Sequence, residues 1–229
     1  MNIKYLHMTV LSLSLFFLMD CAPITSDMQS AKTAGQGGIE ASLNSGGINQ
    51  KTDASGSDGD ISLAVDDRVQ ENIGGSIAYG VNDRLDLKAR YESISLPLAV
   101  DAAEEVSVSM LSLGAKYGII ENKLALFLPY SMYNFDDDST ESVETLSPTV
   151  LYTHTIQEKY EITPSLKYIL PLGDIADTND PGFAFNLGFG YLLNDKVTFR
   201  GEWGQYFPGN NEDDSKFTQT TLGLTYKIK

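Results

Sequence analysis

The sequence predicts an all-β protein, an antiparallel up-and-down transmembrane β-barrel of about ten strands, with about eight strands as the alternative. Two observations lead to this fold class. Apolar residues alternate with small or polar ones from about residue 37 onward, and short turns alternate with long acidic loops. Neighbouring side chains of a strand point to opposite faces, so each such segment has one apolar and one polar face. No segment has the spacing of a long helix.

The first residues have the pattern of an export signal, which we assign to residues 1–20. The apolar run Val10–Leu18 follows Lys4 and is too short to span a bilayer. The run ends in Leu18-Met19-Asp20-Cys21, which resembles the lipobox of bacterial lipoproteins. That resemblance implies lipid attachment at Cys21, although Asp20 stands where the family has a small residue. The alternative is an ordinary secretory leader. Small polar residues without periodicity follow, and predict a flexible N-terminal tether over 21–36.

The barrel is expected to occupy residues 37–229. The clearest strand is Phe183–Tyr191, in which every odd residue is large and apolar and every even residue is small or polar. The same alternation places Val197, Phe199 and Trp203 on one face of the next strand. The predicted strands are approximately 37–44, 65–80, 84–95, 106–118, 123–134, 145–154, 159–170, 183–192, 196–206 and 217–229.

Connections between these segments alternate in length. The short ones are rich in Asn, Asp and Gly, which tolerate the backbone conformations of hairpin turns; they are 80–83, 118–122, 154–158 and 193–195. The long ones are acidic and rich in Gly, Ser and Asp; they are 45–60, 97–105, 136–144, 173–182 and 208–216. Short turns on one side and long loops on the other are typical of barrels that span the outer membrane.

Two segments resemble the short turn and following strand of bacterial outer-membrane β-barrel proteins. They are Tyr79–Leu87 and Leu187–Phe199, and the resemblance extends over residues 37–229 as a small, porin-like barrel domain. Such barrels often end in an aromatic residue, whereas this chain ends in Tyr226-Lys-Ile-Lys229. The resemblance implies a location in the bacterial outer membrane, with lipids of that membrane as partners.

A soluble barrel or sandwich also alternates, with its apolar face turned inward. Tyrosines near the predicted strand ends favour the membrane, because an aromatic ring with a polar tip suits the interface. They are Tyr79, Tyr91, Tyr117, Tyr130, Tyr133, Tyr152, Tyr160, Tyr168, Tyr191 and Tyr226. If the membrane interpretation holds, Phe185, Phe189, Phe199 and Leu224 must point outward.

The polar faces carry charges of both signs, which a closed barrel can pair inside its lumen. We predict a lumen charge network of Glu40, Asp86, Lys88, Arg90, Glu92, Lys116, Glu161, Lys167, Arg200 and Glu202. These charges would either line a selective channel or pair with one another in a plugged interior. About eight strands enclose a space that side chains fill, and wide channels need about 16 to 18. The strand count therefore favours a closed or very narrow lumen.

Composition excludes several functions. The net charge of −15 argues against a nucleic-acid binder, and one Cys with two His leaves no disulfide scaffold or histidine metal cluster. No nucleotide-binding or catalytic motif is present, so no cofactor and no metal site are predicted. His154 at a short turn is the only histidine outside the leader, and we interpret it as structural. Divalent cations could contact the acidic loops around Asp136, Asp174–Asp180 and Glu212.

Three prolines conflict with a continuous barrel wall. Pro129, Pro148 and Pro164 lie inside predicted strands, where proline removes a hydrogen-bond donor of the ladder. We expect β-bulges at these positions, or strand boundaries that differ from the predicted ones by a few residues.

The sequence therefore predicts a non-enzymatic outer-membrane surface barrel, structural or with narrow pore activity, whose N-terminus is periplasmic. The alternatives are a barrel enzyme acting on lipid or peptide, and a soluble lipid-anchored barrel that binds a ligand. No feature of the sequence indicates an oligomeric state.

Overall fold

The computed structural model describes residues 23–55, 62–96, 106–136, 142–173, 176, 180–209 and 216–229. The predicted signal peptide and Cys21 lie outside the described residues, as do parts of the predicted acidic loops. The described residues contain twelve strand segments: β1 (Ile39–Ser55), β2 (Ser62–Asn82), β3 (Leu85–Leu96), β4 (Val106–Ile120), β5 (Leu124–Phe135), β6 (Val143–Leu146), β7 (Thr149–Tyr152), β8 (His154–Ile156), β9 (Tyr160–Leu172), β10 (Gly182–Leu192), β11 (Val197–Phe207) and β12 (Lys216–Lys227).

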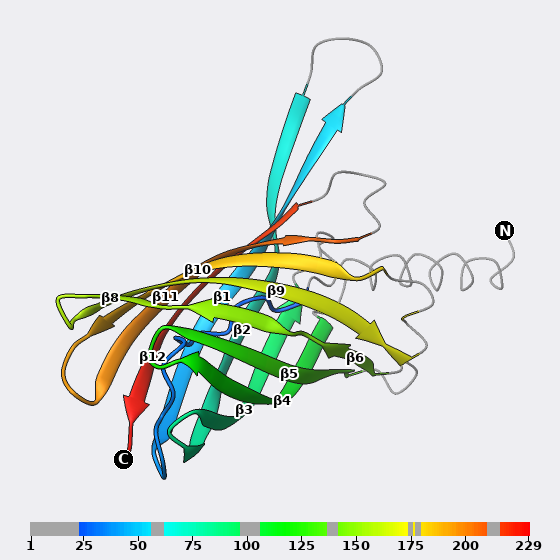
Figure 1. Cartoon of the computed structure of the whole chain (residues 1–229). Helices are drawn as coiled ribbons and strands as arrows, with labels where there is room; N and C mark the ends of the chain where they lie inside the picture. The colour runs from blue at the N-terminus through cyan, green and yellow to red at the C-terminus, as the bar shows by residue number, and fades with distance from the viewer. Residues whose placement is uncertain are drawn as a thin grey trace, which may run out of the picture.

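These segments form a closed antiparallel barrel (Figure 1). Successive strands pair with each other, and β12 closes the wall by pairing with β1 from Glu40↔Lys227 to Lys51↔Lys216. The short segments β6, β7 and β8 all pair with β9, so they are three parts of one wall strand. The barrel therefore has ten strands in up-and-down order, which confirms the predicted fold class.

Prolines explain why that one wall strand is divided. Pro148 lies in the gap between β6 and β7, and the neighbouring β5 carries Pro129 at the same level, where its carbonyl accepts the N–H of Ser147 at 3.0 Å. Pro164 lies within β9, opposite the gap between β7 and β8. We predicted bulges at these prolines; the structure instead interrupts the ladder, because a missing N–H leaves its neighbour without a partner.

The first hairpin is longer than predicted. Residues 45–60 were expected to be a long loop, but β1 continues to Ser55 and β2 begins at Ser62, with Asp53 opposite Ala64. The hairpin extends beyond the rest of the wall (Figure 1). The alternation of apolar and polar residues did not predict these strands, because a hairpin outside the membrane needs no apolar face and this one is mostly polar.

The exterior of the barrel is apolar and its interior is polar, the reverse of a soluble protein. Phe185, Phe189, Phe199 and Leu224 are 42%, 44%, 36% and 49% exposed, so they point outward as predicted. Along β3, by contrast, Asp86, Lys88, Arg90 and Glu92 are all buried. This arrangement fits a barrel whose outer surface contacts lipid, and it excludes a soluble barrel with an apolar interior. No helix in the described part of the chain is long and apolar enough to cross a membrane.

Most of the predicted interfacial tyrosines do lie on the outer wall, but Tyr133 does not. Tyr79, Tyr117 and Tyr226 are exposed, whereas Tyr133 is buried inside the barrel. On β5 the residues with odd numbers face the lumen, as the buried Ala125 and Phe127 on the same strand show. The prediction was wrong for Tyr133 because it ignored this parity.

Arginine on the lipid-facing wall is expected to be costly near the middle of a strand. Leu187 lies at the centre of β10 and is 45% exposed, whereas Leu193 lies in the following turn and is 54% exposed. We expect Leu187→Arg to lower the free energy of unfolding by about 2–4 kcal/mol, and Leu193→Arg by at most about 1 kcal/mol. Urea unfolding in lipid vesicles measures both. Equal losses would contradict the placement of Leu187 in the hydrocarbon.

Candidate functional site in the barrel lumen

The main candidate site is the lumen, and it is occupied by the chain itself. Residues 23–38, which we call the lumen segment, run through the barrel before β1 begins (Figure 1). Ile24, Thr25, Ser26, Asp27 and Met28 are all buried. The sequence analysis expected residues 21–36 to be a flexible tether. The described part of that range is instead enclosed by the barrel and hydrogen-bonded to its wall, so it is not a flexible tether.

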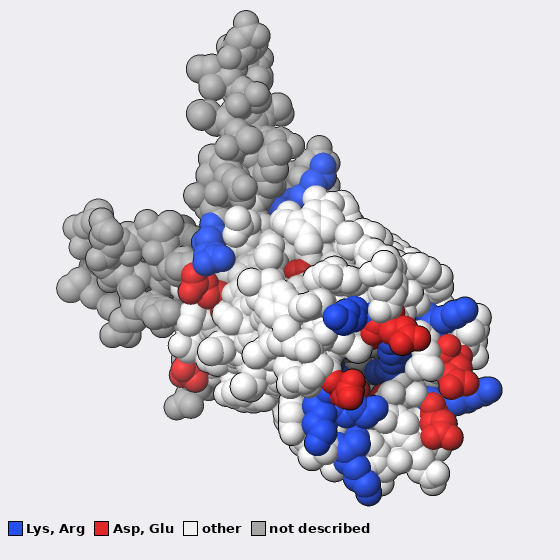
Figure 2. All heavy atoms as spheres, turned by 90° about the vertical axis from the view of Figure 1, so that its left-hand side faces the viewer, with Lys and Arg blue, Asp and Glu red and all other residues white. Residues whose placement is uncertain are grey.

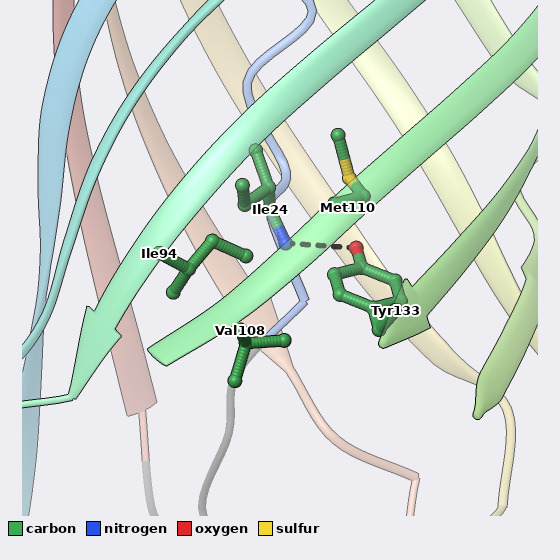
Figure 3. Packing of buried hydrophobic residues seen from close by; sticks show 5 residues of the cluster. All are labelled: Ile24, Ile94, Val108, Met110 and Tyr133. Atoms are coloured by element: carbon green, nitrogen blue, oxygen red, sulfur yellow. Dashed lines mark hydrogen bonds between the residues drawn. The ribbon is translucent and has the colours of Figure 1, made fainter. Parts of the chain in front are cut away.

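The segment begins at the end of the barrel where long loops join the strands. Ile24 packs against Ile94 near the end of β3 and Val108 near the start of β4 (Figure 3). Its backbone N–H donates to the hydroxyl of Tyr133, near the end of β5, over 3.3 Å. We call this the long-loop end. This apolar cluster at the long-loop end shields the neighbouring hydrogen bonds of the lumen segment from water.

The segment leaves the barrel at the opposite end, where the short turns lie. The N–H of Gly37 donates to the carbonyl of Gly80 over 2.8 Å, and Gln36 N–H to Asp83 Oδ1 over 3.2 Å. Gly80 lies near the end of β2, and Asp83 lies in the turn between β2 and β3. Gly35 and Gly37 have φ of 78° and 70°, a backbone region that favours glycine. The segment thus turns sharply there and enters β1.

In the first half of the segment, two wall side chains accept backbone N–H groups. Gln219 Oε1 accepts from Thr25 and Ser26 over 2.7 and 3.0 Å. Glu202 accepts from Asp27 and Met28 over 2.9 and 3.0 Å. Met28 has a φ of 48°, which turns successive N–H groups toward one carboxylate. A left-handed residue costs about 1–2 kcal/mol, which two charge-assisted bonds of about 1.5–3 kcal/mol each offset.

Cationic side chains hold the carbonyl oxygens of the same stretch. Lys167 Nζ donates to the carbonyl of Thr25 over 2.7 Å, and Lys88 Nζ donates to that of Asp27 over 2.8 Å. Arg90 donates to the carbonyl of Ser26. The wall thus pairs its buried cations with backbone dipoles of the segment. This pairing matters because a buried charge without a partner is very costly.

The second half of the segment is held in the same way. Thr153 Oγ1 accepts the N–H of Ala31 over 2.7 Å, and the carboxylate of Asp86 accepts that of Ala34 over 3.1 Å. Lys116 donates to the carbonyls of Ser30 and Lys32 and also forms an ion pair with Asp86. The contacts therefore continue along the whole length of the barrel.

Two side chains of the segment join the charge network of the wall. Asp27 Oδ1 lies 2.8 Å from Lys167 Nζ. Lys32 Nζ lies 2.9 Å from Glu161 Oε1, and Arg200 Nη1 lies 3.0 Å from the other oxygen of that carboxylate. Segment and wall therefore share one set of ion pairs.

One part of the network belongs to the wall. Glu92 accepts from Arg90 Nε over 2.7 Å, Asn44 Nδ2 over 2.8 Å and Asn72 Nδ2 over 2.9 Å. It is completely buried. On neighbouring β2, a Cβ at Gly74 would approach the carboxylate of Glu92 to 2.4 Å, so only glycine leaves room for it. The cluster fixes three neighbouring strands, β1, β2 and β3, relative to one another.

Little space remains beside the segment. The cavity between it and the wall has a volume of about 20 Å³, and is lined by Asp27, Lys88, Arg90, Ser131 and Lys167 among others. Such a volume holds about one water molecule. At the short-turn end, Lys, Arg, Asp and Glu side chains crowd around a recess (Figure 2). Around this cavity, paired charges and the segment thus occupy the lumen of the described barrel.

The structure brings together most of the residues that we assigned to the lumen. Those buried in the wall are Asp86, Lys88, Arg90, Glu92, Lys116, Glu161, Lys167 and Glu202, and Arg200 is mostly buried and bonded to Glu161. Glu40, half-buried at the start of β1, lies outside the ion pairs described above. The sequence analysis missed Asp27 and Lys32. It also missed Asn186 and Gln219, which the polar parity of their strands could have revealed.

The remaining predicted features form no second site among the described residues. His154 is exposed at the start of β8, near a short turn. Within the described ranges, no three His, Cys, Asp or Glu side chains gather in a way that could hold a metal ion. Much of the acidic loops proposed for divalent cations lies outside the described residues.

Comparison with known proteins agrees with this architecture. A family model described as the outer membrane protein beta-barrel domain matches residues 9–227. Among solved structures, the COG4313 outer membrane channel from Pseudomonas putida F1 is similar with a TM-score of 0.52 and 14% identity, over 89% of this chain and 100% of that one.

Two further structures are similar at lower scores. The outer membrane protease OmpT from Escherichia coli has a TM-score of 0.41 and 11% identity, over 91% of this chain and 99% of that one. The KdgM porin in complex with disordered oligogalacturonate has a TM-score of 0.42 and 13% identity, over 82% and 99%. No curated protein sequence matches the chain. The apolar exterior, the closed barrel and the family match together show that this chain belongs to the outer membrane protein beta-barrel domain family of bacterial outer membranes.

Proposed function

We propose that this protein is a non-enzymatic outer-membrane barrel that is closed by its own N-terminal segment. The observation that carries the proposal is the continuous series of hydrogen bonds between the lumen segment and the wall, from Ile24 to Ala34. Charged wall groups satisfy backbone groups at each level of the barrel. A segment bound in this way closes the pore at rest.

Two further observations support closure over pore activity at rest. The space that remains beside the segment has a volume of about 20 Å³, enough for about one water molecule. A barrel of ten strands is also only slightly wider than one that side chains alone can fill. Hydrated ions therefore have no continuous path through the occupied lumen.

The direction of the segment suggests where the N-terminal end lies. Ile24 contacts strand ends at the long-loop end, and Gly37 bonds at the short-turn end. Short turns of outer-membrane barrels face the periplasm and long loops face outward. We therefore propose that Pro23, the first described residue, lies at the cell-surface end of the barrel, whereas the sequence analysis expected a periplasmic N-terminus. Lipid attachment at Cys21 stays a prediction.

Surface labelling and conductance test this proposal together. An epitope inserted immediately before Pro23 is expected to bind antibody on intact cells. The same epitope inserted between Asp83 and Arg84, in an exposed short turn, is expected to bind antibody only after the outer membrane is permeabilised. Purified full chain in a planar bilayer is expected to show no conductance steps. The reverse labelling pattern would contradict the orientation, and steady conductance would contradict closure.

A further inference from the structure

Side chains of the barrel wall contact the lumen segment mainly at the segment's backbone N–H and C=O groups. The wall's acceptors are Gln219, Glu202, Thr153 and Asp86, which bind N–H groups, and its donors are Lys167, Arg90, Lys88 and Lys116, which bind carbonyls. Asn186 Nδ2 adds a second bond to the carbonyl of Thr25, over 3.0 Å. Every polypeptide offers such groups, whatever its sequence.

Most buried side chains of the segment are small, whereas Ile24 and Met28 are larger and also buried. Thr25, Ser26 and Ala31 are each 1% exposed, and Ser30 and Ala34 are also buried. Only Asp27 and Lys32 form ion pairs with the wall. Larger side chains at the buried positions would collide with a wall that leaves almost no free volume. Backbone contacts together with small buried side chains define a class of ligand and not one sequence.

We propose that the lumen is a binding channel for a polypeptide segment rich in small residues, in which the protein's own N-terminal segment is the resident and exchangeable ligand. This inference rests on the proposed closure. The donors and acceptors of the wall match N–H and C=O groups that every polypeptide backbone carries, and the left-handed Met28 brings two successive N–H groups to Glu202. Bonds to ionised groups are stronger than neutral ones, so backbone contacts alone hold a ligand firmly.

Exchange can be tested in a barrel that folds with its segment in place. A site-specific protease sequence inserted after Gln36, which is exposed at the short-turn end, allows the folded chain to be cut there. The segment is then no longer covalently linked to β1. A matched control carries the same insertion after Asp195, in another exposed short turn, so that cutting leaves the segment attached. Labelled peptides are added to both cut proteins, and binding is measured by fluorescence anisotropy.

Three peptides distinguish backbone from side-chain recognition. The first has the native sequence of residues 23–36. The second has Ala at the positions of Ile24, Thr25, Ser26, Ser30 and Thr33, and we expect its affinity to lie within about tenfold of the first. The third carries N-methyl groups at Asp27, Met28, Ala31 and Ala34, which removes the N–H donors to Glu202, Thr153 and Asp86. We expect it to bind at least about 100-fold more weakly, because each charge-assisted bond contributes about tenfold or more.

Each outcome supports or overturns the inference. Binding of the first two peptides to the cut barrel, but not to the Asp195 control, supports it. Backbone recognition is overturned if the N-methylated peptide binds as tightly as the native peptide. It is also overturned if the alanine peptide loses as much affinity as the N-methylated peptide. If the cut segment stays in place and no peptide exchanges, the lumen is closed but not exchangeable, and the inference alone fails. If the segment leaves and the barrel conducts no ions, the proposed closure fails as well.

Discussion

A barrel that lacks residues 23–36 is expected to conduct ions in a planar bilayer, whereas the full chain conducts none. The deleted residues run from the long-loop end to the short-turn end, so their removal opens a continuous path through the lumen. The wall then keeps five buried or mostly buried cations, Lys88, Arg90, Lys116, Lys167 and Arg200, against four carboxylates, Asp86, Glu92, Glu161 and Glu202. Loss of Asp27 also frees Lys167. We expect the open lumen to prefer anions weakly.

A second deletion serves as the control. The β1–β2 hairpin can be shortened at residues 53–64, because Asp53 of β1 pairs with Ala64 of β2. Replacing them by Asn-Gly shortens the hairpin with a favoured two-residue turn and leaves the lumen unchanged. This variant is expected to stay silent. Both variants are first checked for folding by heat-modifiable migration on gels. A folded barrel without residues 23–36 that conducts nothing would mean that wall side chains alone close the lumen.

The wall of the barrel could be predicted from the sequence because lipid imposes a strict pattern on it. Along β10, Phe183 to Tyr191 alternate between outside and inside, and the sequence shows the same alternation. Outward residues such as Phe185 must be apolar, and inward residues such as Asn186 face a polar lumen. The lumen charges on β3 follow from the same parity. The prediction for Tyr133 was wrong because the parity of its strand was not used.

The occupant of the lumen could not be predicted in the same way. Residues 23–38 have the small polar composition of a linker, and they bind through backbone atoms that no side-chain pattern reveals. Their partners, such as Glu202 and Lys88, lie far away in sequence. Composition therefore correctly described a segment without a core of its own, yet could not show that the barrel supplies the partners.

Glu92→Gln is expected to lower the free energy of unfolding by about 3–5 kcal/mol, because it leaves Arg90 buried without its carboxylate. Glu71→Gln is the matched control. The Arg68–Glu71 pair has the same 2.7 Å separation as Arg90–Glu92, but its side chains are each 57% exposed, against 8% and 0% for the buried pair. An exposed pair contributes about 0–1 kcal/mol. Burial, and not geometry, therefore decides between the two effects.

Replacing the buried pair by apolar residues separates the cost of a broken pair from the contribution of an intact one. In Arg90→Met/Glu92→Leu no charge is left alone, and a buried pair replaced in this way often causes little loss. Here Asn44 and Asn72 also lose their acceptor, so we expect the double variant to recover only part of the loss. Urea unfolding in vesicles, followed by fluorescence of Trp203, the only tryptophan in the chain, measures all three variants. Equal losses for Glu92→Gln and Glu71→Gln would contradict the burial of Glu92 in a closed lumen.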